Sequence, residues 1–223
     1  MRTLTTAGTV QLDSRSQSGL ARGARGALKR LFDIGVSATL LLMLVPVIAL
    51  LALLIKCQDR GPAFYRRRVV GPKGEFDAFK LRTMRVDADA VLRNNASLRR
   101  EFEINFKLKN DPRVTPLGAA LRKTSLDELP QLWNVLIGQM SLVGPRPLIL
   151  DEHAHVNGWK ERRLTLKPGI TGLWQVLGRD EIPFEDMVKL DFLYVTNWSI
   201  VNDLRLILRT PSVLAGARAH GSR

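Results

Sequence analysis

The feature of this sequence that most constrains its fold is an uncharged apolar run, IGVSATLLLMLVPVIALLALLI, at residues 34–55. A straight helix of that length would measure ~33 Å, enough to cross the hydrocarbon core of a bilayer. A secretory signal peptide does not fit, because a long polar segment precedes the run and no A-x-A-type cleavage site follows it. The length and the absence of charge therefore predict a membrane helix. A fully buried helix of a soluble protein is the alternative.

Both flanks of this run are basic, and its middle holds a proline. The flanking cations are Arg22, Arg25, Lys29 and Arg30 before the run, and Lys56, Arg60, Arg66, Arg67 and Arg68 after it. Lysine and arginine collect on the cytoplasmic side of membrane helices, and here they lie at both ends. Pro46 removes a helix hydrogen bond and favours a kink. Because residues 34–46 cover only ~20 Å, a re-entrant helix that enters the bilayer and returns fits best, and a kinked spanning helix stays open.

Composition narrows the class of partner and of metal. Lys and Arg number 34 against 21 Asp and Glu, a formal charge of +13, which favours nucleic acid, anionic lipid headgroups or phosphorylated small molecules. The single cysteine, Cys57, excludes an internal disulfide and fits a reducing compartment. Three scattered histidines are too few for a zinc site, so a bound metal would be a hard cation held by carboxylates and phosphate oxygens.

The length and patterning predict a single compact α+β domain, predominantly helical, beside the membrane helix. The predicted parts are a flexible basic arm at 1–28, the membrane helix at 29–56, a cytoplasmic domain at 57–210 and a C-terminal tail at 211–223. A charged helix is expected over 86–109, with an apolar stripe that includes Leu98, Phe102 and Phe106.

Two β-like runs surround the turn residues at 71–74, which predicts a small hairpin. In the second run Phe79 and Leu81 alternate with Lys80 and Arg82, so one face is expected to pack while the other presents cations.

Two helices with large apolar faces are expected near the C-terminus. Their aromatic residues Phe192, Tyr194 and Trp198 suit a membrane interface, which would make these helices interfacial and amphipathic. Packing against the domain core is the alternative.

An acidic pair, Asp127 and Glu128, precedes an apolar helical run in the segment LRKTSLDELPQLWNV. Proline is tolerated only in the first turn of a helix, so Pro130 places the helix start close to Asp127. The structural interpretation is that Asp127 is the N-cap, or that Ser125 and Glu128 form a capping box.

The neighbours of the pair favour a chemical interpretation. Arg122 and Lys123 lie within five residues of Asp127, and a carboxylate among cations has a depressed pKa and stays ionised, as a nucleophile or Mg²⁺ ligand must. Further cations stand in short motifs, with Lys80 and Arg82 in KLRTM and Arg146 in GPRP. An arginine held between prolines can offer its planar fork to phosphate oxygens. Salt-bridged surface arginines are the commoner explanation for each motif alone.

Four blocks of the sequence carry a resemblance: KRLFD, FKLRTM, LRKTSLDELPQLWNVLIGQMSLVGPRP and LKPGITGLWQVLGR. With them, residues 29–210 resemble the bacterial sugar transferase family, the monotopic phosphoglycosyl transferases. A longer branch of that family carries additional transmembrane helices before this domain, and the chain resembles the compact catalytic form. The family's re-entrant helix often has Ser-Pro at its break, where this chain has Val45 and Pro46.

The resemblance implies an enzyme that transfers a sugar 1-phosphate from a UDP-sugar, such as a UDP-hexose, to polyprenyl phosphate and releases UMP. It implies that Asp127 is the nucleophile that forms a phosphosugar intermediate, and that Glu128, with Asp127, is associated with Mg²⁺. Arg122 and Arg146 correspond to phosphate-contacting arginines, and Lys80 and Arg82 to a basic motif near the site. The expected location is the cytoplasmic face of the bacterial inner membrane, in contact with anionic lipids.

Two other functions remain to be tested. A membrane-anchored basic protein without chemistry would bind DNA in a strongly salt-dependent way, although nucleic acid is not expected as a partner here. A glycosyltransferase that passes only the sugar would release UDP. The sequence leaves open which sugar is transferred and the oligomeric state, a homodimer included.

Overall fold

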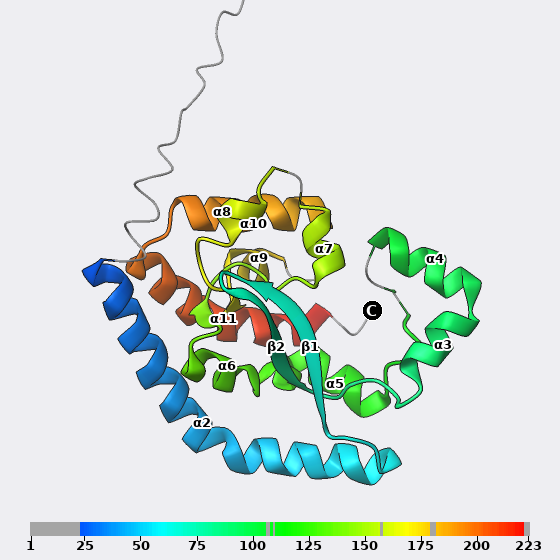
Figure 1. The fold of residues 1–223 in the computed structure, drawn as a ribbon. Coiled ribbons are helices and arrows are strands. Elements are labelled where there is room, and N and C mark those ends of the chain that lie inside the picture. The colour runs from blue at the N-terminus through cyan, green and yellow to red at the C-terminus, as the bar shows by residue number, and fades with distance from the viewer. Residues whose placement is uncertain (1–22, 106–107, 109, 157, 179–181, 221–223) are drawn as a thin grey trace, which may run out of the picture.

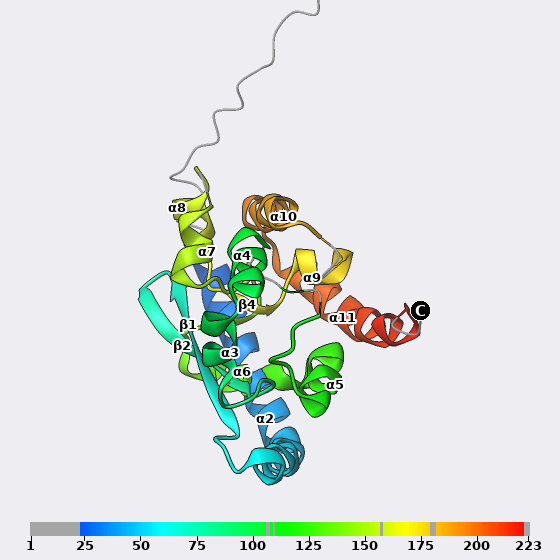
Figure 2. The same cartoon turned by 90° about the vertical axis from the view of Figure 1, so that its right-hand side faces the viewer.

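The computed structural model describes residues 23–105, 108, 110–156, 158–178 and 182–220, so residues 1–22 of the predicted arm and Phe106 lie outside the described part. The elements are α2 (Ala24–Asp59), β1 (Phe64–Gly71), β2 (Gly74–Leu81), α3 (Ala88–Asn94), α4 (Ala96–Asn105), α5 (Pro116–Thr124), the 3₁₀ helix η1 (Leu126–Glu128), α6 (Gln131–Ile137), β3 (Ser141–Val143), α7 (Leu150–Ala154), α8 (Lys160–Arg163), β4 (Gly169–Thr171), α9 (Leu173–Leu177), α10 (Phe184–Thr196) and α11 (Ile200–His220). The predominantly helical character predicted from the sequence is confirmed. In both views α2 forms the lower edge and α8 and α10 the upper one (Figures 1 and 2).

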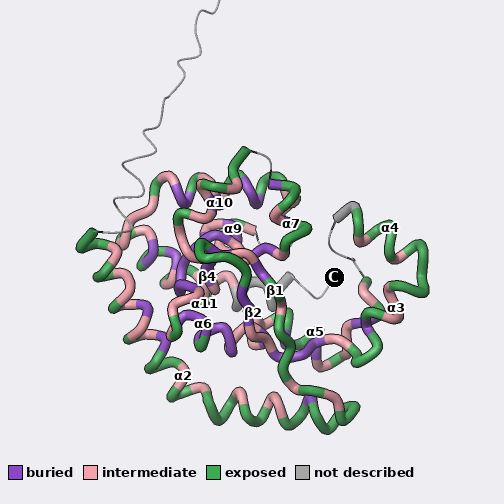
Figure 3. Tube along the Cα trace, viewed as in Figure 1, coloured by how far each residue is buried: buried purple, intermediate pink, exposed green. Residues whose placement is uncertain are grey.

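The apolar run lies inside α2, a continuous helix of 36 residues that contains Pro46. Figure 1 shows that α2 bends about midway along its length. Most of its apolar side chains are exposed, among them Leu42 at 80% and Met43 at 66%, as Figure 3 shows by the largely green lower edge. Among the described residues, α2 is the one helix long and apolar enough to cross a membrane, by length and composition. The exposed apolar surface does not fit the buried soluble helix that was the alternative.

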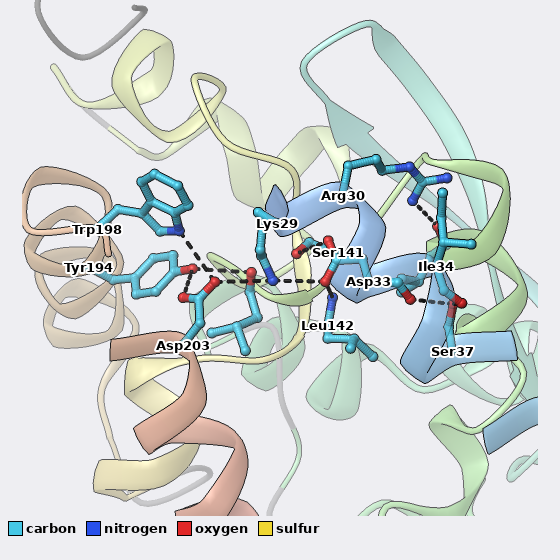
Figure 4. Close-up of polar contacts among 12 residues, drawn as sticks. Lys29, Arg30, Asp33, Ile34, Ser37, Ser141, Leu142, Tyr194, Trp198 and Asp203 are labelled. Carbon is cyan, nitrogen blue, oxygen red and sulfur yellow. Dashed lines mark hydrogen bonds and ion pairs between the residues drawn. The ribbon is translucent and has the colours of Figure 1, made fainter. Parts of the chain in front are cut away.

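Polar contacts fix the first turns of α2 to the rest of the protein (Figure 4). The Arg30 guanidinium donates to the carbonyl oxygens of Val135 at 2.5 Å and Leu136 at 2.7 Å, where α6 leaves its last carbonyls without helical partners. The buried Asp33 carboxylate accepts from the Ser141 hydroxyl at 2.8 Å and from the Leu142 amide at 3.2 Å. The start of α2 is therefore joined to α6 and β3.

The predicted hairpin is confirmed, because β1 and β2 pair antiparallel with Gly71 opposite Gly74. The predicted faces of β2 are wrong in part. Phe76 and Ala78 are the buried residues of the middle of the strand, and Phe79 points to the other, half-exposed face. Lys80 shares the face of Ala78 because side chains two apart lie on one side of a strand. It is directed inward rather than toward solvent, and its side chain is 17% exposed.

The core lies between α6, the short parallel pair β3 and β4, and the helices α10 and α11. Its buried members include Leu132, Val135, Val143, Tyr194 and Leu206. Tyr194 is 5% exposed, and its hydroxyl donates to the Val143 carbonyl at 3.1 Å and to Asp203 at 2.7 Å.

The two predicted C-terminal helices exist as α10 and α11. Tyr194 and Trp198 follow the alternative, because both pack on the core and donate hydrogen bonds to Asp203, and the interfacial placement of the two helices stays a prediction. The Phe192 ring packs on the Trp159 ring at a centroid distance of 3.8 Å. The last helix continues to His220, well into the segment predicted as a tail.

The single helix predicted over 86–109 is two helices, α3 and α4, because Asn95 between them has an extended backbone (φ −115°, ψ 102°). The Asn95 side chain then accepts from the amides of Ser97 at 3.1 Å and Leu98 at 3.2 Å, which caps the start of α4.

Candidate active site

The acidic pair stands on η1, a single 3₁₀ turn between α5 and α6. Ser125 ends α5 in the left-handed region (φ 55°, ψ 20°), so the chain turns sharply before Asp127. Leu126 packs against a small apolar cluster that contains Ile55 of α2 and Leu81 of β2. This contact fixes η1 between α2 and the hairpin.

Neither capping interpretation of the pair is correct. The helix that follows begins at Gln131, and its N-cap residue is Pro130 rather than Asp127. Ser125 makes no side-chain capping bond, so there is no capping box with Glu128. Asp127 is therefore a buried carboxylate in a single turn, without the role in helix initiation that the sequence offered as the alternative to chemistry.

Lys80 joins the two carboxylates. Its ammonium lies 2.5 Å from Glu128 Oε1 and 3.9 Å from Asp127 Oδ2. The side chain of Asp127 is 10% exposed and that of Glu128 is 31% exposed, so the pair opens to solvent on the Glu128 side. Two adjacent acids sharing one cation carry a net negative charge that must be offset by other groups.

The two carboxyl groups have pKa values shifted in opposite directions. Burial raises the pKa of Asp127 above its ordinary value, Lys80 opposes this, and the negative charge of Glu128 adds to the increase. Burial also acts upward on the pKa of Glu128, but Lys80 together with more distant arginine charges outweighs it, and the pKa of Glu128 is lowered. The depressed pKa predicted for Asp127 is therefore wrong, because the loss of hydration there exceeds the effect of the cations.

Arg122 lies beside Asp127 at the end of α5. Its Nε donates to the Thr83 hydroxyl at 2.8 Å, which orients the guanidinium. The positive charge of Arg122 lowers the pKa of Asp127. The charge of the predicted Arg122 therefore acts on the acidic pair.

Arg146 lies in the loop after β3. Its charge contributes to the lowered pKa of Glu128, and its guanidinium carbon lies 4.6 Å from the centre of the Trp174 ring. Lys80 contacts the acidic pair, and the charges of Arg122 and Arg146 act on it from two other parts of the chain.

Arg82 does not join this cluster. It is 8% exposed, its guanidinium forms an ion pair with Asp59 at the end of α2, and its Nε donates to the Pro62 carbonyl at 2.6 Å. A further bond reaches the Met84 carbonyl at 3.3 Å. Its phosphate contact stays a prediction, whereas the observed contacts join α2 to β2.

Arg67 is a site residue that the sequence analysis missed. Its charge lowers the pKa of Glu128, and it donates to Glu152 at 3.1 Å. Arg67 pairs with Ala78 across the hairpin, so it projects on the same face as Lys80. The signal existed in the hairpin register, which the turn residues fix once a two-residue connection is assumed.

The site offers two adjacent carboxylates, those of Asp127 and Glu128, as possible ligands for Mg²⁺. Among the described residues there is no group of three or more His, Cys, Asp or Glu side chains that could hold a metal ion by itself. Mg²⁺ in phosphate-handling sites is commonly bound by one or two carboxylates, with substrate phosphates and water completing the coordination. Asp127 and Glu128 are suited to that mode of binding.

Comparison with known proteins gives a match to the family described as bacterial sugar transferase over residues 24–217. The chain is 43% identical over 205 residues to the undecaprenyl-phosphate galactose phosphotransferase of Salmonella typhimurium. It is 37% identical over 198 residues to the UDP-glucose:undecaprenyl-phosphate glucose-1-phosphate transferase of Klebsiella pneumoniae. It is 39% identical over 215 residues to the exopolysaccharide production protein ExoY of Sinorhizobium fredii.

The relatives differ in length. The match covers 90% of this chain but 43% of the Salmonella protein, and 84% of this chain but 40% of the Klebsiella protein. With ExoY it covers 94% of this chain and 95% of that protein. The matched segments contain the whole acidic site.

Proposed function

Because the chain belongs to the bacterial sugar transferase family, we propose that it transfers a sugar 1-phosphate from a UDP-sugar to polyprenyl phosphate and releases UMP. The observation that carries the proposal is the buried Asp127 carboxylate, which has no capping role, lies 3.9 Å from the Lys80 ammonium and feels the positive charge of Arg122. Relatives named for undecaprenyl-phosphate galactose and glucose transfer support a hexose donor and the same carrier lipid. The name of ExoY supports a role in exopolysaccharide production.

The reaction has two displacements at one phosphorus atom. An Asp127 carboxylate oxygen attacks the β-phosphorus of the UDP-sugar, the bond from that phosphorus to the bridging oxygen breaks, and UMP leaves with the electron pair. A phosphate oxygen of the lipid then attacks the same phosphorus, and the Asp127 carboxylate leaves. The product is polyprenyl diphosphate sugar, and the enzyme is regenerated.

The cations of the site oppose the repulsion among these anions. Arg122 and Arg146 can offer paired N–H donors to phosphate oxygens, and Lys80 keeps Glu128 ionised at 2.5 Å. Glu128 and Asp127 are the residues that would hold Mg²⁺, which supplies positive charge beside the phosphate oxygens when bound. Burial of Asp127 removes water from the nucleophile, so these fixed charges act in a medium of low dielectric constant.

The placement of α2 supports action at the cytoplasmic face of the inner membrane. Arg30 and Asp33 join its first turns to α6 and β3, and Asp59 joins its last turn to β2. Two ends attached to one body lie on one side of a bilayer, so the apolar middle enters and returns at Pro46. The acidic pair is then close to the headgroup plane, where the phosphate of a lipid acceptor lies.

The test is the identity of the nucleotide product. Purified full-length protein is incubated with Mg²⁺, undecaprenyl phosphate and either UDP-glucose or UDP-galactose, and the nucleotide is separated by chromatography. UMP is expected. Release of UDP would show transfer of the sugar alone. If neither UMP nor UDP is released, this chain does not act on these donors.

A further inference from the structure

We propose that Asp191, Arg163 and Trp174 form a clamp that positions Arg146 on the donor phosphates. The clamp would make these three side chains positioning residues, which act through Arg146 without touching the substrate. The inference rests on the proposed function, and it assigns a role to a buried ion pair that the chemistry itself does not use.

The first part of the clamp holds the backbone of Arg146 from both sides. The Arg146 amide donates to the Asp191 carboxylate oxygens at 3.1 and 3.3 Å. The Arg146 carbonyl accepts from Arg163 Nη2 at 2.5 Å. Both peptide groups that flank the Arg146 side chain are therefore fixed, and the direction of its Cα–Cβ bond is fixed with them.

Asp191 and Arg163 also bind each other. Arg163 donates to Asp191 Oδ2 through Nη2 at 2.6 Å and through Nε at 3.1 Å. Asp191 is fully buried at 0% exposure and Arg163 is 4% exposed. A buried ion pair gains little net stability over apolar residues of similar size, so a specific geometric role is a better account of it. The pair joins α10 to α8 and places Arg146 relative to both.

The second part of the clamp holds the side chain. The Arg146 guanidinium carbon lies 4.6 Å from the centre of the Trp174 ring, a cation–π distance. Trp174 is 7% exposed, and its Nε1 is buried without a hydrogen-bond partner among the described residues. The structure therefore uses the face of this ring and makes no use of its N–H group.

The loop before Arg146 is fixed as well. The Gly144 amide donates to the Thr171 carbonyl at 2.9 Å, and the Pro145 carbonyl accepts from the Gly169 amide at 2.9 Å. A Cβ on Gly144 would lie 2.3 Å from the Lys167 carbonyl oxygen, so the two segments approach as only glycine permits. With the clamp, these bonds fix the position of the Arg146 guanidinium before any substrate arrives, which lowers the entropy lost when it binds phosphate.

The experiment measures donor binding in full-length Asp127→Asn protein, which cannot turn the donor over, by calorimetry in detergent with UDP-glucose and UDP-galactose. Asp191→Asn keeps the size of the side chain and one acceptor oxygen but loses the charge that holds Arg163. We expect a donor Kd weaker by about tenfold, the loss of one well-aligned charge-assisted contact. Trp174→Leu should weaken binding similarly, and Trp174→Phe should stay within about twofold because the ring face remains.

The decisive comparison adds Asp191→Asn to an Arg146→Ala background. Without a guanidinium to position, Asp191→Asn should change the donor Kd by less than about twofold. The matched control is Asp203→Asn, a carboxylate that is also buried, at 1% exposure, and also hydrogen-bonded, to Tyr194. It lies outside the clamp, and its effect on donor Kd should be the same with and without Arg146.

Three outcomes overturn the clamp. One is an unchanged donor Kd in Asp191→Asn, and another is an equal loss from Asp191→Asn in both backgrounds. The third is an equal donor Kd in Trp174→Leu and Trp174→Phe, which rejects the role of the ring. This comparison decides if Asp191→Asn does not fold. Absence of donor binding to the Asp127→Asn reference, together with no UMP from wild type, overturns the proposed function and the clamp with it.

Discussion

Asp127 and Glu128 are neighbours in the chain, yet their environments separate their pKa values. Burial raises the pKa of Asp127, whereas Lys80 at 2.5 Å lowers the pKa of Glu128. The group proposed as nucleophile therefore holds its proton to a higher pH than an ordinary aspartate. The environment that activates this carboxylate by removing water also limits the pH range in which it is ionised.

The first prediction concerns the acid side of the pH profile of kcat/KM. Attack needs the Asp127 carboxylate, so activity should fall as pH decreases through its raised pKa. Lys80→Met removes a charge that lowers the pKa of Asp127, so the acid limb should move to higher pH. Glu128→Gln removes a charge that raises the pKa of Asp127, so the limb should move to lower pH, whatever the loss in rate. If the acid limbs of Lys80→Met and Glu128→Gln moved in the same direction, a group other than Asp127 would control the profile.

The second prediction is that Asp127→Asn makes the protein more stable at neutral pH while it abolishes UMP release. A carboxyl group whose pKa is raised on folding contributes stability below its unfolded pKa and loses it as pH rises through the folded pKa. At pH 7 the ionised buried Asp127 therefore destabilises the fold, and the amide removes this effect, by on the order of 1 kcal/mol.

Thermal unfolding at pH 7 and near pH 4 checks this. The increase in Tm should be present at pH 7 and should shrink as pH falls through the raised pKa of the wild-type carboxyl. A lower Tm at pH 7 would show that the carboxylate has a stabilising structural role, contrary to the absence of a capping bond.

At this scale the sequence predicted the charged residues well and their surroundings poorly. Lys80 contacts Asp127 and Glu128, and the charges of Arg122 and Arg146 act on the pKa values of this pair, whereas the catalytic roles of these residues stay predictions. The burial of Asp127 could not be predicted from the sequence, because it depends on Leu126 packing against residues of α2 and β2 that lie far away in the chain.

Among the elements, the hairpin could be predicted from its turn residues, whereas the helix break at Asn95 was not predicted. Gly71 and Gly74 bound a two-residue turn that fixes the register, a local effect that sequence reasoning captures well. The break between α3 and α4 depends on an asparagine side chain that caps the second helix, which competes with continuation of the first. Arg82 shows the same limit, since its partner Asp59 belongs to a different element.

The third prediction is that Arg82 contributes mainly to the attachment of α2. Arg82→Lys keeps the charge but cannot satisfy Asp59, Pro62 and Met84 together, so unfolding should become easier by about 1–3 kcal/mol. Asp59→Asn should lower the Tm in the same direction, because it removes the charged partner of the same guanidinium. Arg68→Lys, at an exposed ion pair of the hairpin, is the control and should change the Tm little. A loss of donor affinity in Arg82→Lys at unchanged Tm would instead support the phosphate contact predicted from the motif.

For the whole molecule, the decisive relation is between α2 and the body that it supports. The apolar run, its basic flanks and Pro46 are local features, and from them the sequence predicted a kinked membrane helix. It did not predict that polar side chains at both ends of one helix bond to the same body, because Asp33 meets Ser141 across a sequence separation of 108 residues. These contacts oppose a straight α2, since a helix without the bend would carry one end away from its partners (Figure 1).

The last prediction is that both ends of the chain are cytoplasmic. Cysteines are placed singly at Ser18, before α2, and at Ser212, on an exposed position of α11, in a Cys57→Ser background that removes the exposed native thiol. Both should resist an impermeant thiol reagent in intact cells and react once the cells are opened, because α2 returns to the side from which it entered. Replacing Pro46 by Leu restores the missing helix hydrogen bond and favours a straight helix. That variant should then release its contacts at Arg30 and Asp33, lower the Tm and expose the Ser18 site in part of the population. Labelling of the Ser18 site in the protein that retains Pro46, with the Ser212 site protected, would establish a spanning helix and contradict the attachment of both ends to one body.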